Sequence, residues 1–144
     1  MAPVSIGLAR LRLAAFKDYT SICNSAPSEI LALIALRARE AVLARSREIV
    51  LGNLHSLDSF FNRWSHLFEW VRPRAGCTGF PRLLSKTPVE QFAAELVEQQ
   101  GVLLLPGGVY GHPGNHFRLG FGRTNLPDAL SRFERFCEAW VAQG

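Results

Sequence analysis

The pattern of hydrophobic and polar residues predicts helices over the first half of the chain. A short amphipathic helix is expected over residues 6–16, and a long helical region with Ser25 as its N-cap follows a polar connection. Residues 30–36 are apolar nearly all round, which predicts burial on several sides, whereas residues 37–48 alternate charge with alanine. One long element therefore runs from a buried setting to an exposed one.

Turn-forming residues interrupt this region at Gly52 and Asn53. Apolar side chains then return at helical spacing through residue 68, so the chain forms either a kinked continuation or a second helix. Residues 30–36 and the aromatic-rich stretch 60–70 hold more apolar surface than one small sheet can cover. We therefore expect exposed apolar patches of the kind that mark interfaces.

The second half of the chain carries four strand patterns. Residues 69–72 and 79–84 are expected to form short strands, and Pro81 places the second of them at a sheet edge. Residues 102–105 form an apolar run that predicts a buried strand, and the alternating residues 116–122 predict its neighbour.

Two helices accompany these strands. The first, over residues 88–100, starts at a capping box from Thr87 to Glu90, and the second covers residues 126–142. The predicted fold class is α+β, with a long N-terminal helical segment leading into a small mixed β-sheet covered by helices. In domain terms we expect a single partial unit, with residues 1–68 as the helical segment and residues 69–144 as a small α/β domain.

Composition and charge narrow the class of protein. Hydrophobic residues make up 48% of the 144 residues and charged residues 19%, which argues against disorder. The net charge of +4 comes from fourteen arginines and two lysines that are scattered along the chain. Scattered arginines indicate solvated helix faces, so no nucleic-acid partner is expected. A small basic nucleic-acid-binding module remains an alternative.

Three cysteines, Cys23, Cys77 and Cys137, lie far apart and form no C-x-x-C pair. This usage predicts a reducing compartment, with the thiols as small core residues. The longest aliphatic run, residues 30–36, is too short to span a bilayer, and no convincing secretion signal precedes it. We therefore expect a cytoplasmic protein with no membrane partner.

The segment 103–123 contains the main candidate for binding chemistry. In a strand, alternation places Phe117, Leu119 and Phe121 on one face and leaves Arg118 on the other, beside glycine positions. A guanidinium with free space beside it suits a carboxylate or phosphate, which it can bind with two parallel hydrogen bonds. Alternatively, Arg118 lies on the solvated face of the sheet.

The sequence supports the other candidate sites less well. His112 and His116 are four residues apart, but Pro113 between them excludes the helix that would hold both on one face for a metal, so no metal site is expected. Lys86 lies in a turn that opens the next helix, and no nucleophile triad has supporting local context.

Four segments, taken in order, resemble a known protein family. They are KDYTSICNSAPSE, WVRPRAGCTGFPRL, PVEQFAAELVEQQGVLLLPGGVYG and HFRLGFGR. The chain resembles the C-terminal (small) domain of fold-type I pyridoxal-phosphate-dependent aminotransferases of class I/II, from residue 16 to about residue 136. The resemblance implies that Arg118 binds the α-carboxylate of the substrate. It also implies that Asn24 and Ser25 lie towards the cofactor site of a partner subunit in a homodimer, although helix capping explains Ser25 equally well.

The resemblance also implies that the cofactor-binding lysine lies outside the residues that match. In such enzymes a large domain holds pyridoxal 5'-phosphate through a Schiff-base lysine, and neither Lys17 nor Lys86 has the matching motif. We therefore expect a domain of an enzyme that transfers an amino group between an amino acid and a 2-oxo acid. The domain is expected to be inactive without its large domain and to hold no cofactor covalently. The main alternative is an orphan dimerisation or interaction domain.

Overall fold

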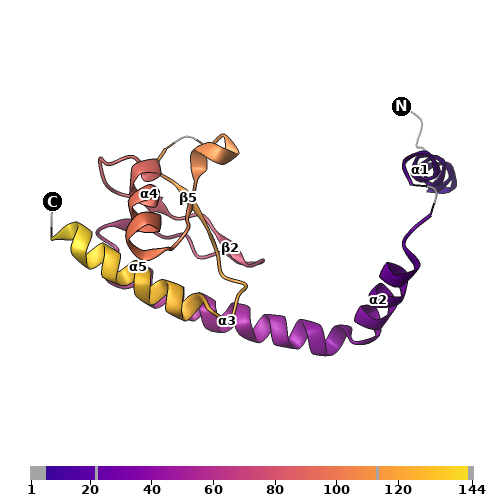
Figure 1. The fold of residues 1–144 in the computed structure, drawn as a ribbon, viewed down its shortest axis with the longest axis horizontal. Helices are drawn as coiled ribbons and strands as arrows, with labels where there is room; N and C mark the ends of the chain where they lie inside the picture. The colour runs from indigo at the N-terminus through magenta and orange to yellow at the C-terminus, as the bar shows by residue number, and fades with distance from the viewer. Residues whose placement is uncertain (1–5, 22, 113, 143–144) are drawn as a thin grey trace. The chain divides into compact units, whose positions relative to one another are not determined.

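The computed structural model describes residues 6–21, 23–112 and 114–142. The chain divides into two compact units, residues 1–43 and residues 44–144, and each is described by itself. Figure 1 labels helices α1 to α5 and strands β2 and β5 along the chain. Helices dominate, and short strands lie between residues 68 and 120, so the predicted α+β fold class is confirmed.

The first unit is helical. Helix α1 (Ile6–Thr20) continues past its predicted end at residue 16, and the Thr20 hydroxyl donates to backbone oxygens one turn back. Helix α2 (Ala26–Arg37) begins after Ser25, as predicted, but the Ser25 side chain makes no capping hydrogen bond. No residue of α2 is buried, so the burial predicted for residues 30–36 is wrong within this chain.

The long helix α3 (Arg39–Arg63) corrects the predicted position of the helix break. The break falls at Ala38, and Gly52 and Asn53 lie inside α3. These residues fit there because the buried Asn53 side chain is bonded to distant backbone instead of competing for its own helix. A turn-forming pair therefore does not end a helix when tertiary bonds satisfy it.

Five short strands form two antiparallel sheets. Strand β1 (Phe68–Glu69) pairs with β3 (Arg82–Leu83). Strand β5 (Phe117–Gly120) lies between β2 (Thr78–Gly79) and β4 (Leu105–Pro106). Every pairing among the described residues is antiparallel, where a mixed sheet was expected.

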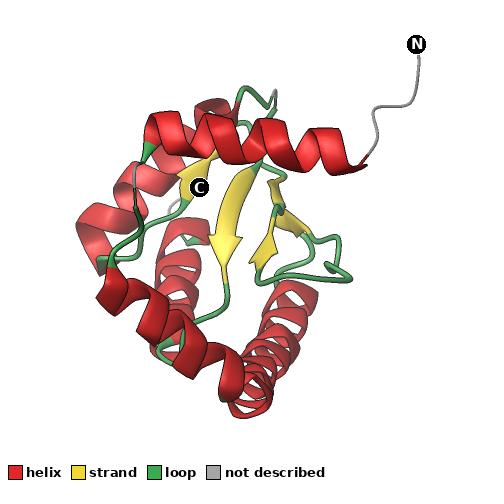
Figure 2. Ribbon diagram, turned by 90° about the vertical axis from the view of Figure 1, so that its right-hand side faces the viewer, coloured by secondary structure: helices red, strands yellow, loops and turns green. Residues whose placement is uncertain are grey.

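Two details of these strands differ from the prediction. The expected strand over residues 79–84 splits into β2 and β3, with Pro81 in the interruption because proline cannot donate to a ladder. The strand predicted over residues 102–105 pairs with β5 only from Leu105 onward, with Leu105 opposite Arg118 and Pro106 opposite Phe117. Figure 2 shows β5 as the longest of the strands.

Helix α4 (Val89–Gln100) has its N-terminus capped from a distance. Its first turn makes no capping bond with the Thr87 side chain, so the predicted capping box is wrong. Instead, Asn115 Oδ1 accepts a hydrogen bond from the Val89 N–H at 3.2 Å. The Asn115 amide also donates to the carbonyls of Ser85 and Thr87, at 3.0 and 2.9 Å. Asn115, two residues before β5, thus fixes the start of α4.

The core is aromatic and lies in the second unit. Helix α5 (Leu126–Val141) contributes Phe133, whose ring lies 5.0 Å from that of Phe60 in α3 and 5.6 Å from that of Phe68. Phe133 also contacts the rings of Phe92 in α4 and Phe117 in β5. The aromatic stretch 60–70 is therefore largely covered, and the expected exposed patch there is wrong.

Candidate functional site

Strand β5 presents Arg118 on its exposed face. Phe117, Leu119 and Phe121 are buried while Arg118 and Gly120 are exposed, so the predicted alternation is confirmed. A side chain added at Gly120 would meet no atom within 4 Å. The guanidinium therefore lies on the same face of the strand as an open position two residues away.

A short turn lies against this strand. The 3₁₀ helix η1 (Gly107–Tyr110) follows β4 and brings the Tyr110 hydroxyl within 3.5 Å of Arg118 Nη1. The turn is attached to the residue before β5, because the Gly107 N–H donates to the His116 carbonyl at 2.6 Å. A Cβ at Gly107 would come within 3.0 Å of the same carbonyl oxygen, so only glycine fits there without a shift.

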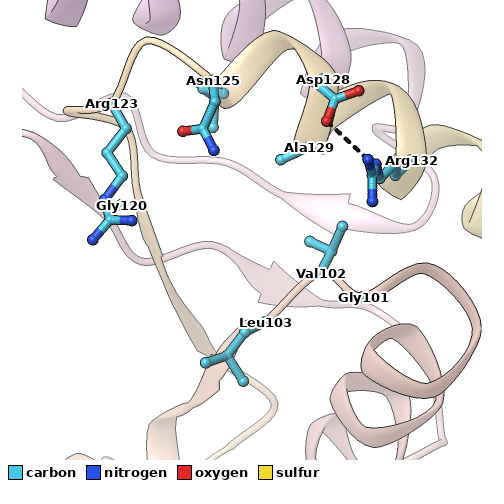
Figure 3. A pocket seen from close by; sticks show the side chains of 10 residues that line it. Gly101, Val102, Leu103, Gly120, Arg123, Asn125, Asp128, Ala129 and Arg132 are labelled. Atoms are coloured by element: carbon cyan, nitrogen blue, oxygen red, sulfur yellow. Dashed lines mark ion pairs between the residues drawn. The ribbon is translucent and has the colours of Figure 1, made fainter.

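A cavity of about 450 Å³ opens beside Gly120. Figure 3 shows it between residues 101–103 on one side and the first turns of α5 on the other. Two arginines line it: Arg123 follows β5, and Arg132 is paired with Asp128 at 3.2 Å. Arg118 does not line this cavity. Gly120 does line it, and Gly120 also shares the exposed face of β5 with Arg118.

The lysines do not form a cofactor pocket in this chain. Lys17 is exposed and donates to Ser21 at 3.3 Å and to Asn24 Oδ1 at 2.8 Å. Lys86 is also exposed and does not line the cavity beside Gly120. An amine that forms a Schiff base needs a shaped and partly desolvated site. The described residues therefore do not fit covalent attachment of pyridoxal phosphate.

Asn24 and Ser25, the predicted cofactor-side residues, are exposed residues of the first unit. Asn24 accepts the hydrogen bond from Lys17, and Ser25 occupies the N-cap position of α2. Their backbone and side chains remain accessible, and their role towards a cofactor stays a prediction. Arg118 belongs to the second unit.

The two histidines come together despite the absence of a helix between them. The rings of His112 and His116 lie 4.5 Å apart, and the His116 ring stacks on Phe80 at 5.5 Å. The loop itself folds the two side chains together, so they meet without the helix that their spacing would require. In the described ranges, no three His, Cys, Asp or Glu residues gather as metal ligands.

The cysteines divide into two environments. Cys137 is buried in α5, as predicted, and burial raises the pKa of its thiol, with the charges of Glu134 and Glu138 acting in the same direction. Cys23 and Cys77 are exposed, so their assignment to the core is wrong. Within the described part of the chain, no helix is both long and apolar enough to cross a membrane.

One residue that supports the site gave no sign of its role in the sequence. Asn53 donates through its amide to the carbonyls of Phe121 and Arg123, at 2.9 and 2.7 Å. It therefore ties α3 to the end of the strand that carries Arg118. In the sequence it is a polar residue after Gly52 inside an apolar helical stripe, and that pattern predicts a turn.

The fold of this chain is similar to part of several known enzymes. No family model matches the chain. A PLP-dependent aminotransferase from Streptococcus suis superposes with a TM-score of 0.79 at 30% identity, over 88% of this chain and 34% of that one. A PLP-dependent cyclase, OrfR, superposes with a TM-score of 0.74 at 28% identity, over 85% of this chain and 34% of the cyclase.

A curated relative agrees with these structures. Capreomycidine synthase from Streptomyces vinaceus is 27% identical over 109 residues, which are 76% of this chain and 28% of the synthase. The chain thus spans about a third of the length of the proteins it matches. Pyridoxal phosphate is the cofactor of the enzymes that share this architecture. The sequence resemblance is confirmed, and the chain has the fold of the small, C-terminal domain of fold-type I, PLP-dependent aminotransferases.

Proposed function

We propose that this chain is the small domain of a PLP-dependent enzyme that transfers an amino group between an amino acid and a 2-oxo acid. In this proposal Arg118 binds the substrate α-carboxylate. The observation that carries it is an exposed guanidinium on the central strand, beside open space at Gly120, in a chain with the aminotransferase fold. The cofactor and its lysine would belong to a large domain that has no counterpart in residues 1–144.

The role of Arg118 follows from its shape and surroundings. A guanidinium offers parallel N–H groups that match the two oxygens of a carboxylate. None of the five ion pairs found between described residues uses Arg118. Its one hydrogen bond to a described side chain is the long contact with Tyr110, so most of its donors remain available for a ligand.

The test uses a chimera that joins the large domain of the Streptococcus suis aminotransferase to this chain. Arg118→Lys keeps the charge but loses the planar fork, so it should cost about 1.5 to 3 kcal/mol of transition-state binding. That loss corresponds to a fall in kcat/KM of roughly ten- to a hundredfold for an amino acid substrate. Turnover of the corresponding amine, which lacks the carboxylate, should fall far less.

Two results would count against the proposal. Equal losses for the amino acid and the amine would mean that Arg118 supports the fold and does not bind substrate. A chimera that folds and binds pyridoxal phosphate but converts its substrate without consuming a 2-oxo acid would favour cyclase chemistry, as in the name of OrfR. Arg82→Lys serves as the control, because Arg82 is an exposed arginine on the neighbouring sheet.

A second candidate function is an interaction domain, and the exposed apolar face of α2 favours it. Ile30, Leu31 and Ile34 are each more than half exposed, at 60%, 65% and 56%. Contiguous apolar patches of this kind on a soluble protein mark interaction sites. The dimer of an intact enzyme would also use such a surface.

We expect the purified chain to self-associate and to bind a hydrophobic dye through α2. Replacing Ile30 and Ile34 by lysine should reduce both effects, because the two positions lie one turn apart on the same face. Light scattering across a range of concentrations measures the first effect and dye fluorescence the second. A control that adds two lysines at the exposed Ser46 and Gln99 should change neither. A wild-type chain that stays monomeric throughout contradicts the interaction-domain candidate.

A further inference from the structure

We propose that Tyr110 is a second carboxylate-binding residue, which acts together with Arg118. The inference rests on the proposed function, because it concerns the same substrate carboxylate. Its basis is the 3.5 Å approach of Arg118 Nη1 to the Tyr110 hydroxyl, which joins the turn after β4 to the central strand.

The ring of Tyr110 is not buried, so core packing does not fix its position. Backbone hydrogen bonds of the turn that carries Tyr110 fix it instead. The Gly107 N–H donates to the His116 carbonyl, and the His112 N–H donates back to the Gly107 carbonyl at 3.1 Å. Gly111 closes the turn with φ +67°, a conformation that favours glycine. These contacts hold η1 against the residue that precedes β5, so the phenol stays over the strand.

The surroundings of the ring indicate a role other than core packing. Tyr110 is 51% exposed, and its ring contact among the described residues is the edge of Phe80 at 6.5 Å. Phe80 itself stacks on His116, so one side of the phenol faces an aromatic wall. An exposed tyrosine adds little to folding, whereas its hydroxyl is placed beside a cation.

The chemistry follows from the donors and acceptors of a phenol. A tyrosine hydroxyl has one O–H donor and can accept hydrogen bonds at the same oxygen. When it accepts from Arg118, its own proton remains free to donate to an anion. The arginine meanwhile keeps further N–H groups for the same ligand. A carboxylate at this site would therefore receive hydrogen bonds from Arg118 and from the Tyr110 hydroxyl, and the Arg–Tyr bond would orient both.

The first test needs only the 144-residue chain. Nitrogen NMR measures how fast the Arg118 guanidinium rotates about its Cζ–Nη bonds, and Arg118→Lys identifies the signal. Tyr110→Phe, which removes one oxygen atom, should speed this rotation by roughly two- to tenfold, the effect of losing one ordinary hydrogen bond. Tyr19→Phe, at the 90% exposed Tyr19, should leave it unchanged. Equal rotation in Tyr110→Phe and the wild type overturns the inference, whatever the enzyme does.

The second test uses the chimera with the Streptococcus suis large domain. Tyr110→Phe should raise KM for the amino acid by roughly three- to tenfold with a smaller change in kcat, and should leave the amine unaffected. An unchanged KM for the amino acid contradicts a binding role for Tyr110. The two hypotheses can fail separately. The proposed function fails if Arg118→Lys lowers kcat/KM equally for the amino acid and the amine. The Arg–Tyr contact still stands in that case if Tyr110→Phe speeds the rotation of the Arg118 guanidinium.

Discussion

Phe133→Ala is expected to lower the free energy of unfolding by about 3 to 5 kcal/mol, the range for removing a buried phenylalanine ring. Phe133 is 1% exposed and contacts aromatic rings from α3, α4 and β5, so its loss leaves a cavity at the centre of the core. Because several rigid rings surround this position, the site can collapse only partly. Urea unfolding followed by far-ultraviolet circular dichroism measures the change.

The matched control is Phe16→Ala. Phe16 is 67% exposed on α1, so its removal should change the unfolding free energy by less than about 0.5 kcal/mol. A similar loss for both variants would contradict the packing described here.

Asn53→Asp should destabilise the second unit by about 2 to 4 kcal/mol at neutral pH. The substitution keeps the size of the side chain but replaces the amide donor with a carboxylate oxygen. That oxygen would face the carbonyls of Phe121 and Arg123, which now accept from Asn53 at 2.9 and 2.7 Å. The site is only 6% exposed, so water cannot readily replace the lost donor.

The control for this variant lies on the same helix. Asn62→Asp places the same new charge at an exposed position of α3 and should leave stability nearly unchanged. The Asn53→Asp defect should shrink as pH falls, since a buried carboxyl has a raised pKa and its protonated form can again donate one hydrogen bond. A defect that is independent of pH would point to a cause other than the missing donor.

Hydrophobic periodicity predicted the elements that bury one face. Alternation in residues 116–122 placed Phe117 inside and Arg118 outside, and helical spacing located α4 and α5, because in each case burial against one neighbouring surface determines the pattern. The same reasoning failed for residues 30–36, because no residue of α2 is buried in the described part of the chain. Periodicity shows which face prefers burial, and it gives no information on what covers that face.

Polar contacts over long sequence distances were not predictable. Asn53 donates to the carbonyls of Phe121 and Arg123, which follow it by 68 and 70 positions in the sequence. Asn115 caps a helix that begins 26 residues earlier. A side chain of this type gives the same local signal whether it bonds its own turn or a distant backbone group. The contact between Tyr110 and Arg118 was equally hidden, because it depends on how η1 folds back towards β5.

The remote cap of α4 has a consequence for the order in which this unit folds. Helices with a local cap can start from neighbouring residues alone, but the first N–H of α4 finds its acceptor on Asn115, just ahead of β5. The start of α4 is therefore complete only after a loop of more than twenty residues has closed, at an entropic cost that local contacts do not carry. We therefore expect the first turn of α4 and the entry to β5 to become stable together during folding.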